Sequence, residues 1–337
     1  MKDETENHKR RFEDFSNQTL EARWLSERDR DYKDNKQWTD DQVSVLNARG
    51  QAPVTDNRVK QKVEGLKGLL IQRRTDPKGY SRTKAHEAAS EAVTDALRYV
   101  ADNTEFDDLE LAVFDNLIVE GYGGCIVDIV PRKDEIEINP TLIPWDRIYF
   151  DPYSRRLDFK DAQYMGIVMW MDEEVAKATF PKAKDVIEEC ADSDEFGETF
   201  SDRPKWREVS GDRKRIRLAH EFYQEDGKWM ECIFCGNGYL AKPRPSTYLD
   251  EDGQPENPIE LVGAYIDRDN NRFGEVRYWI DLQNEVNHRR SKFLFTLSHR
   301  QTVSKKGAVK DIPALKRELS KPNGHVEYEG DTGDFDI

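Results

Sequence analysis

The chain has 337 residues, and 52 Lys and Arg against 67 Asp and Glu give it a formal net charge of −15. Hydrophobic residues make up 36% and charged residues 35%, with a mean hydropathy of −0.88, whereas aromatic residues reach 10%. The length predicts about two domains, and the aromatic content is far above that of a disordered chain. Apolar residues are nevertheless scarce for one compact globule, so we expect an elongated fold whose burial is completed by neighbouring subunits.

Charge, hydropathy and cysteine content exclude several classes of protein. The acidic balance argues against a protein that grips nucleic acid through an excess of Lys and Arg, although a local basic patch stays open. No apolar run approaches the ~18 residues of a membrane span, and residues 1–15 lack the apolar core of a secretory signal, so we expect no membrane partner. Four cysteines are no disulfide framework and favour a reducing interior.

Helical periodicity runs through the first 120 residues. Thr39 and Gln42 form a predicted capping box for a short helix, Asp56 is the predicted N-cap of the next helix, and the last helix is predicted to stop at the glycine cluster 121–124. The apolar sides of the longer stretches are predicted at Phe12, Phe15, Leu20, Trp24 and Leu25, at Val59, Val63, Leu66 and Leu70, at Ala85, Ala89, Ala92, Ala96 and Val100, and at Leu109, Val113, Leu117 and Ile118.

From residue 124 the apolar period changes to two, which predicts strands. A helix of about 25 residues is predicted from Gly274 to about Arg300, and short strands and turns follow it up to residue 337. The predicted fold class is therefore α+β. Between the glycine cluster and the long helix we predict strands at 125–130, 135–139, 163–171, 215–223, 229–235 and 260–266, short helices at 173–179 and 182–190, and loops at 191–212 and 242–258.

Cys232-Ile233-Phe234-Cys235 is a CxxC motif, which occurs in zinc sites and in redox pairs. A zinc site needs four ligands, but the sequence holds no second CxxC, and His220 stands alone. A redox pair favours a helix N-terminus, whereas this motif lies in strand-like sequence. We therefore interpret it as structural, and we expect no metal site and no cofactor. The glycine cluster 121–124 is likewise no phosphate loop, because it follows a helix and precedes a strand.

One carboxylate pattern leaves a nuclease hypothesis open. Metal-dependent nucleases combine an Asp with a downstream Asp/Glu-x-Lys, in which carboxylates hold the metal and the Lys orients water. Asp151 with Asp158-Phe159-Lys160 fits that pattern, but Asp34-Asn35-Lys36 repeats the tripeptide, as chance predicts in a chain so rich in charge.

The predicted long helix separates apolar from polar residues. From Arg277 to Arg317 there are ten Lys and Arg against three acids, a net +7 in 41 residues, so the other 296 residues carry −22. Positive charge gathered in one segment of an acidic protein suggests a nearby polyanion, although an ordinary solvated helix face is the alternative. The apolar stripe is predicted at Trp279, Leu282, Val286, Phe293 and Leu297, and the opposite side at Arg277, Asp281, Asn284, His288, Ser291, Lys292 and His299.

Four ordered stretches resemble the portal proteins of short-tailed, podovirus-type bacteriophages and related prophages. They correspond to that family's charged N-terminal helix, its helix-to-strand joint, its aspartate-rich signature and the start of its stem helix. In this sequence they are Arg28-Asp29-Arg30-Asp31-Tyr32 with Gln37-Trp38, Asn116 to Gly124, Ile143-Pro144-Trp145-Asp146 through Asp151-Pro152 with Asp158 and Asp161-Ala162, and Phe273-Gly274-Glu275-Val276-Arg277 with Asp281, Gln283, Asn287 and Ser291.

The resemblance implies a non-enzymatic subunit of a ring of about twelve copies at a capsid vertex, through which double-stranded DNA is packaged and ejected. It implies the terminase large subunit, tail or adaptor proteins, and capsid and scaffolding proteins as partners. The location implied is the virion, with assembly in the bacterial cytoplasm. Members of the family continue into a second stem helix and a crown, which we expect this chain to lack.

The resemblance also divides the chain. It implies a wing with a helical part at 1–123 and a β-rich part at 124–272, a stem helix at 273–301 and a clip at 302–337. The residues that it places at the DNA channel are Arg289, Arg290, Lys292, His299, Arg300, Lys305 and Lys306. The alternative functions are a metal-dependent nuclease and a monomeric adaptor that binds proteins through its long helix.

Overall fold

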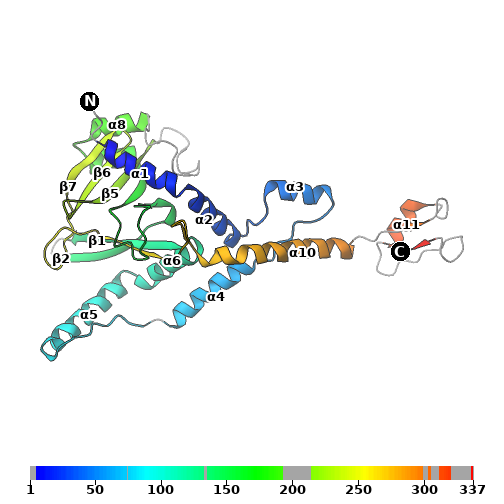
Figure 1. Ribbon diagram of the computed structural model, residues 1–337, viewed down its shortest axis with the longest axis horizontal. Helices are drawn as coiled ribbons and strands as arrows, with labels where there is room; N and C mark the ends of the chain where they lie inside the picture. Colours follow the sequence, from blue (N-terminus) through cyan, green and yellow to red (C-terminus); the bar gives the residue numbers. More distant parts are fainter. Residues whose placement is uncertain are drawn as a thin grey trace. The chain divides into compact units, whose positions relative to one another are not determined.

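The computed structural model describes residues 5–73, 75–132, 135–192, 214–298, 303–304, 311–319 and 335–336. The chain divides into two compact units, one formed by 1–34 with 59–280 and the other by 35–58 with 281–337. Helices and strands are both abundant (Figure 1), so the predicted α+β class is confirmed. Among the described residues, no helix is long and apolar enough to cross a membrane.

The first unit has a mainly helical block followed by a mainly β-stranded block. Helices dominate up to residue 119 and strands dominate after it, as the change of period predicts. The helices are α1 (Glu6–Gln18), α2 (Leu20–Lys33), α4 (Arg58–Gln72), α5 (Glu87–Asn103), α6 (Phe106–Val119), α7 (Glu173–Thr179) and α8 (Lys184–Asp192), with short 3₁₀ turns η1 (Lys84–His86), η2 (Trp145–Arg147) and η3 (Glu275–Trp279). The strands are β1 (Tyr122–Arg132), β2 (Glu135–Leu142), β3 (Ile148–Phe150), β4 (Tyr164–Asp172), β5 (Arg215–Glu225), β6 (Lys228–Cys235), β7 (Gly238–Pro245), β8 (Ile259–Gly263), β9 (Tyr265–Ile266) and β10 (Arg272–Phe273).

The largest sheet has five antiparallel strands in the order β3-β4-β5-β6-β7. Helix α1 contributes the fully buried rings of Phe12 and Phe15 to its main core, beside Tyr149 and Phe222. Helices α7 and α8 form a separate apolar cluster with β5 and β6, in which Ile187 is fully buried. The sheet is thus held between the N-terminal helix and the α7–α8 pair.

A smaller sheet has the order β2-β1-β8, with both pairs antiparallel. The chain enters it from α6 through Gly121, whose φ of +92° is a conformation that other residues rarely adopt. A Cβ at Gly121 would lie 2.0 Å from the carbonyl carbon of Phe273, so the joint admits only glycine. The predicted helix stop at this cluster is confirmed.

A third apolar cluster joins α4, α6 and η3. Val59 and Val63 of α4 contact Ile118 of α6, and Val276 and Ile280 complete the cluster. The approach of η3 to α6 is close: a Cβ at Gly274 would lie 2.2 Å from the carbonyl oxygen of Ile118.

The second unit holds α3 (Asp40–Ala48), α10 (Ile280–Ser298, whose first residue belongs to the first unit), β11 (Val303–Ser304), α11 (Ile312–Leu319) and β12 (Phe335–Asp336). The capping box predicted at Thr39 is confirmed: its hydroxyl accepts from the Gln42 amide, and the Gln42 side chain accepts from the Thr39 amide. Helix α11 was not predicted, because only turns and strands were expected beyond residue 300.

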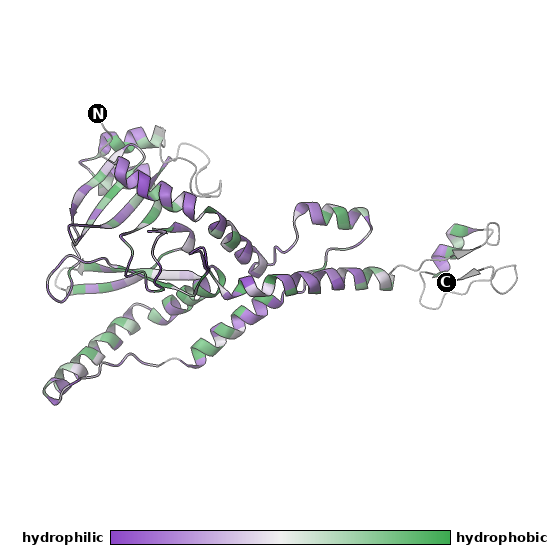
Figure 2. Ribbon diagram, in the orientation of Figure 1, coloured by the Kyte–Doolittle hydropathy of each residue, from purple (hydrophilic) through white to green (hydrophobic). Residues whose placement is uncertain are grey.

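Several predicted apolar sides are wrong. Leu20 and Trp24 are 59% and 63% exposed, because α2 turns its small and polar residues, including Ala22 and Ser26, inward. The alanine side of α5 is also exposed, and Thr94 is the buried residue of that helix. Figure 2 shows hydrophobic residues recurring along α5.

Two further predictions are corrected. The expected loop at 242–258 begins with strand β7, whose Pro-containing sequence is accommodated by a bulged register against β6. Short strand β3 was also not anticipated.

The predicted N-cap at Asp56 lies two residues before the helix start at Arg58. The Asp56 carboxylate pairs with Arg58 and Arg290. Most of the predicted polar loop 191–212 lies outside the described residues.

Candidate functional site

Helix α10 carries three buried polar side chains, each about one helical turn after the previous one. Gln283, Asn287 and Ser291 are each 2% exposed or less, although glutamine and asparagine are usually solvated. Their spacing of four residues places them on one side of the helix. Buried amides and hydroxyls need hydrogen-bond partners, and the second unit supplies them from segment 54–58.

The three side chains bind every second backbone amide of that segment. The amide of Val54 donates to Ser291 Oγ (2.9 Å), that of Asp56 to Asn287 Oδ1 (3.1 Å) and that of Arg58 to Gln283 Oε1 (2.9 Å).

The spacings of helix and segment match. Four helical residues rise roughly 6 Å, and two extended residues span roughly 6.6 Å. Two further bonds, from Gln283 Nε2 to the Asp56 carbonyl (2.8 Å) and from Asn287 Nδ2 to Gln37 Oε1 (2.6 Å), complete the set. We call these three side chains and segment 54–58 the polar ladder.

The polar ladder corrects part of the predicted orientation of α10. Three residues of the predicted apolar stripe, Leu282, Phe293 and Leu297, are 61%, 64% and 65% exposed, whereas Trp279 and Val286 are half-buried. Ser291, assigned from sequence to the solvated side, is buried. Sequence reasoning missed the ladder because buried amides carry no hydropathy signal; the recurrence at 283, 287 and 291 was the available indication.

Three of the predicted channel cations lie in the described part of α10. Arg289 pairs with Glu285 one turn earlier, and Arg290 pairs with Asp56 at 2.9 Å. Lys292 is exposed and makes no ion pair with any described residue. His299, Arg300, Lys305 and Lys306 lie outside the described residues.

Within the second unit, Lys292 lines a cavity of about 540 Å³, whereas Arg289 and Arg290 do not. Trp38 donates its indole N–H to the Val54 carbonyl (3.3 Å), and the imidazole of His288 stands edge-on to the Trp38 ring at 4.8 Å between centroids. Arg49 also lines the cavity. Cationic and aromatic groups therefore meet at one surface of the α3–α10 pair.

Arg277, also counted among the segment's cations, has a structural role in the first unit. Its Nε donates to Asp29 Oδ2 at 3.1 Å, and the Asp29 side chain is fully buried. Burial raises the pKa of Asp29 above its usual value, although Arg277 and Arg28 oppose the shift. Arg277 is therefore committed to a buried pair.

The carboxylates of the nuclease hypothesis organise a loop. Asp151 accepts from the backbone amides of Tyr153 (3.0 Å) and Gln163 (3.1 Å) through its two oxygens. Asp158 forms paired bonds with the guanidinium of Arg156 (2.7 and 2.6 Å), which lower the pKa of its carboxyl below the usual range. Among the described residues, no group of three or more His, Cys, Asp and Glu side chains could hold a metal ion.

The CxxC cysteines do not pair with each other. Cys235 of β6 forms one disulfide with Cys190 of α8, a pairing that the sequence analysis did not predict. Cys232 is a free thiol beneath α1, 3.7 Å from His8 Nδ1, and burial followed by the nearby Glu221 charge raises its pKa. A thiol held in its neutral form is a poor nucleophile.

Comparison with known proteins identifies one family. The family model described as "Phage P22-like portal protein" matches residues 9–336, nearly the whole chain. No curated protein sequence matches the chain.

Proposed function

Because the chain belongs to the phage P22-like portal protein family, we propose that it is one subunit of a homo-oligomeric ring at a capsid vertex, forming the channel through which double-stranded DNA is packaged and ejected. The match over residues 9–336 is the observation that carries this proposal. The family is a structural one, so we expect neither nucleotide nor DNA turnover.

In this proposal the chain is divided as the resemblance implies. Residues 1–123 and 124–272 form the wing, 273–301 the stem helix and 302–337 the clip. The channel cations are Arg289, Arg290, Lys292, His299, Arg300, Lys305 and Lys306. Terminase, tail or adaptor proteins, and capsid and scaffolding proteins dock on the ring.

The charge distribution suits a conduit through which DNA slides. Phosphate contacts carry no sequence information, and contacts between exposed charges are screened beyond about 8–10 Å at physiological salt. A strongly basic channel would hold DNA in place, whereas an acidic protein with a few exposed cations touches it weakly. Lys292, exposed and without an ion pair among the described residues, is the clearest candidate for such a contact.

The polar ladder supports this role for α10. A helix beside moving DNA must keep its rotation, and hydrogen bonds fix rotation more specifically than apolar contacts do. The ladder sets the angular positions of Arg289 and Lys292 relative to segment 54–58.

The first test is negative-stain electron microscopy with light scattering on the purified chain. Rings with a central hole are expected, and a chain that is monomeric at every concentration would contradict the proposal.

The second test is packaging with the triple variant Arg289→Glu/Arg290→Glu/Lys292→Glu. Rings should form, and the amount of DNA packaged should fall about tenfold or more, because each reversed charge repels phosphate. The matched control reverses three exposed cations elsewhere, Arg10→Glu/Lys182→Glu/Lys228→Glu, and should package normally. Equal packaging by both triple variants would remove these α10 residues from the channel.

A further inference from the structure

A small cavity of the first unit is lined by two arginines and by no acid. Its volume is about 20 Å³, and its walls include Ala22 and Arg23 of helix α2 and Arg272 of strand β10. None of the described residues that line it is an Asp or a Glu. One water molecule needs roughly 10–15 Å³, so the cavity has room for a single water or for one ion of similar size.

Both arginines that line the cavity are buried. Arg23 is 9% exposed and Arg272 is 4% exposed, although arginine is mostly a surface residue. Arg23 is fixed by its bonds to the start of α2 and the end of α1: its Nε donates to Thr19 Oγ1 (3.2 Å) and its Nη2 to the Ser16 carbonyl (2.9 Å). Burial lowers the pKa of Arg23 and lowers the pKa of Arg272 to about 10, because removal from water disfavours the charged form.

The two terminal nitrogens of Arg272 are unequally bonded. Nη2 donates to the Ser154 carbonyl (3.2 Å), to Ser154 Oγ (3.1 Å) and to the Arg156 carbonyl (3.1 Å), which are all neutral acceptors. The buried Nη1 has no hydrogen-bond partner among the described residues. The charge of Asp161 opposes the lowering of the Arg272 pKa only in part. Arg272 therefore keeps a donor and a positive charge that the described residues do not fully satisfy.

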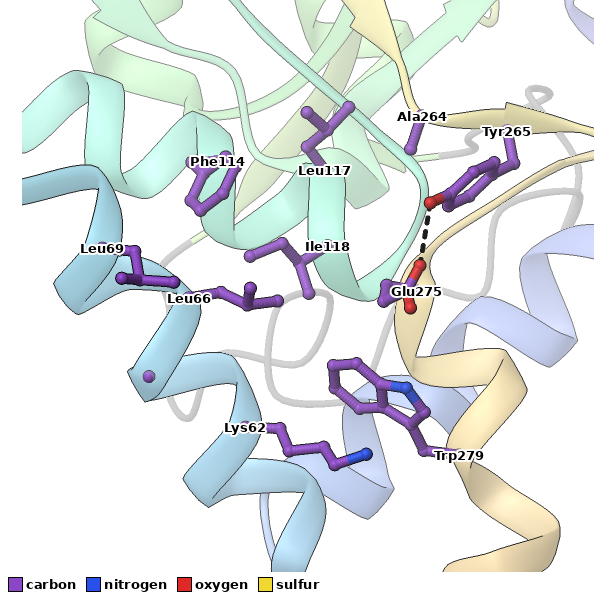
Figure 3. A pocket seen from close by; sticks show the side chains of 11 residues that line it. Lys62, Leu66, Leu69, Phe114, Leu117, Ile118, Ala264, Tyr265, Glu275 and Trp279 are labelled. Carbon is purple, nitrogen blue, oxygen red and sulfur yellow. Dashed lines mark hydrogen bonds between the residues drawn. The ribbon is translucent and has the colours of Figure 1, made fainter. Parts of the chain in front are cut away.

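The larger cavity beside α4, α6 and η3 shows no such excess of positive charge. Its volume is about 680 Å³, and one cation, Lys62, and one acid, Glu275, line it. The Lys62 ammonium lies 4.8 Å from the centroid of the Trp279 ring, and Glu275 accepts from the Tyr265 hydroxyl at 2.9 Å (Figure 3). Of these two cavities, only the small one is lined by cations alone.

We infer that the cavity lined by Arg23 and Arg272 binds one small monovalent anion, of which chloride fits the volume. Two like charges repel strongly where water is excluded, and an anion held by both offsets that repulsion. Hydrogen bonds from a guanidinium to an anion are also stronger than those to a neutral acceptor. A water molecule could accept from Arg272 Nη1, but it would leave both positive charges uncompensated. Sulfate and phosphate are too large for this cavity.

The bound anion would join the N-terminal helices to the segment that leads into η3. Arg23 belongs to α2, whereas Arg272 belongs to β10, which ends one residue before Gly274. An ion that binds only the folded chain stabilises it by mass action. This inference goes beyond the proposed function, because it holds for a single copy whether or not the copies form a ring.

The first experiment measures stability against chloride concentration. Sodium chloride replaces sodium methanesulfonate at constant ionic strength, since methanesulfonate is too large for the cavity and general screening then stays the same. The ratio of folded to unfolded chain should rise about tenfold or more up to about 200 mM chloride and then level off. Sodium bromide should act similarly. A stability that does not depend on which anion is present would contradict the site.

Two variants and one control connect the chloride effect to the cavity. Arg272→Met removes one cation, and Ala22→Val keeps both cations but fills the space with two methyl groups. Both variants should lose the chloride dependence. Arg268→Met removes an exposed cation four residues before Arg272 and should keep the full dependence. Equal chloride dependence in all three variants would show that the anion acts elsewhere.

A crystal structure of the wild type grown in sodium bromide locates the ion without relying on any variant to fold. An anomalous bromide peak bounded by the guanidinium groups of Arg23 and Arg272 is expected. An ordered water at that position would overturn the inference. A bromide peak without any effect of chloride on stability in solution would mean an adventitious ion only, which would overturn it as well.

Discussion

Arg30 is the residue on which the buried charges between α2 and α6 depend. Its guanidinium donates to both oxygens of Glu120 (2.5 and 2.6 Å), to Asp115 (2.7 Å) and to the Asn116 side chain (3.0 Å). Glu120 is fully buried, and burial raises its pKa to about 8 although Arg30 opposes the shift. The pair lies at the start of the glycine joint and so holds α2 against the helix that enters the sheet.

We predict that Arg30→Met lowers the free energy of unfolding by about 3–5 kcal/mol, because a buried carboxylate loses its partner. The loss should be larger at pH 9, above the raised pKa of Glu120, than at pH 6, where this carboxyl is protonated. Chemical denaturation at both pH values measures the effect. The control is Arg10→Met, whose partner Glu6 is a surface pair with both side chains more than half exposed, and it should change stability by less than about 1 kcal/mol. Equal effects of the two variants would contradict this account.

Asp115 gives the same network an acid dependence. Burial alone would raise its pKa, but hydrogen bonds from Lys33 and Arg30 lower the pKa of Asp115 below its usual value. A carboxyl with a lowered folded-state pKa contributes stability above its unfolded value of about 3.9, and that contribution is lost as the pH falls.

We therefore predict that the stability difference between wild type and Asp115→Asn shrinks as the pH falls from 5 toward 2. Denaturation across this range measures it. A difference that stays constant with pH would show that Asp115 contributes through packing and not through its charge.

Among the secondary-structure elements, α10 depends most on polar contacts. The side chain of Asn287 binds the Asp56 amide, Gln283 and Gln37. Asn287→Ala leaves the Asp56 amide without its acceptor, which costs about 1–3 kcal/mol for a buried group.

We expect the amide of Asp56, with those of Val54 and Arg58, to exchange hydrogen about tenfold faster or more in Asn287→Ala. Hydrogen exchange resolved to these residues measures it. Lys292→Ala, an exposed position on the same helix, should leave all three rates unchanged. Unchanged rates in Asn287→Ala would mean that other contacts hold segment 54–58.

Element types were predictable wherever the periodicity was strong. The hairpin of β1 and β2, strand β4 and helices α7 and α8 lie close to their predicted ranges, because alternation and helical spacing follow directly from which face is buried. The capping box at Thr39 was readable because it is purely local.

Predictions that depended on a partner surface failed. Leu20, Trp24 and the α5 alanines were assigned inward from hydropathy alone, and the described residues of this chain leave them exposed. The polar ladder and the Cys190–Cys235 disulfide join residues far apart in sequence. The recurrence at 283, 287 and 291 indicates a shared helix side, but no local pattern identifies the partner segment or the disulfide pairing. The order of the family's stretches identified the family even though individual faces were misassigned.

At the scale of the molecule, several large apolar side chains on helices are exposed to solvent. Leu282, Phe293 and Leu297 of α10 and Leu69 of α4 are all more than half exposed in a protein with only 36% hydrophobic residues. A single copy gains little by exposing them. The composition and these exposed side chains support the proposal that association of copies completes the burial.

Association also makes stability depend on concentration, since partners that bind only the folded chain stabilise it by mass action. We predict that the melting temperature rises by about 5 °C or more between about 1 and about 100 µM protein. Differential scanning calorimetry at fixed scan rate measures it, with Leu69→Gln expected to reduce the rise. A melting temperature independent of concentration would mean that the exposed apolar helices of this chain are not covered by copies of itself.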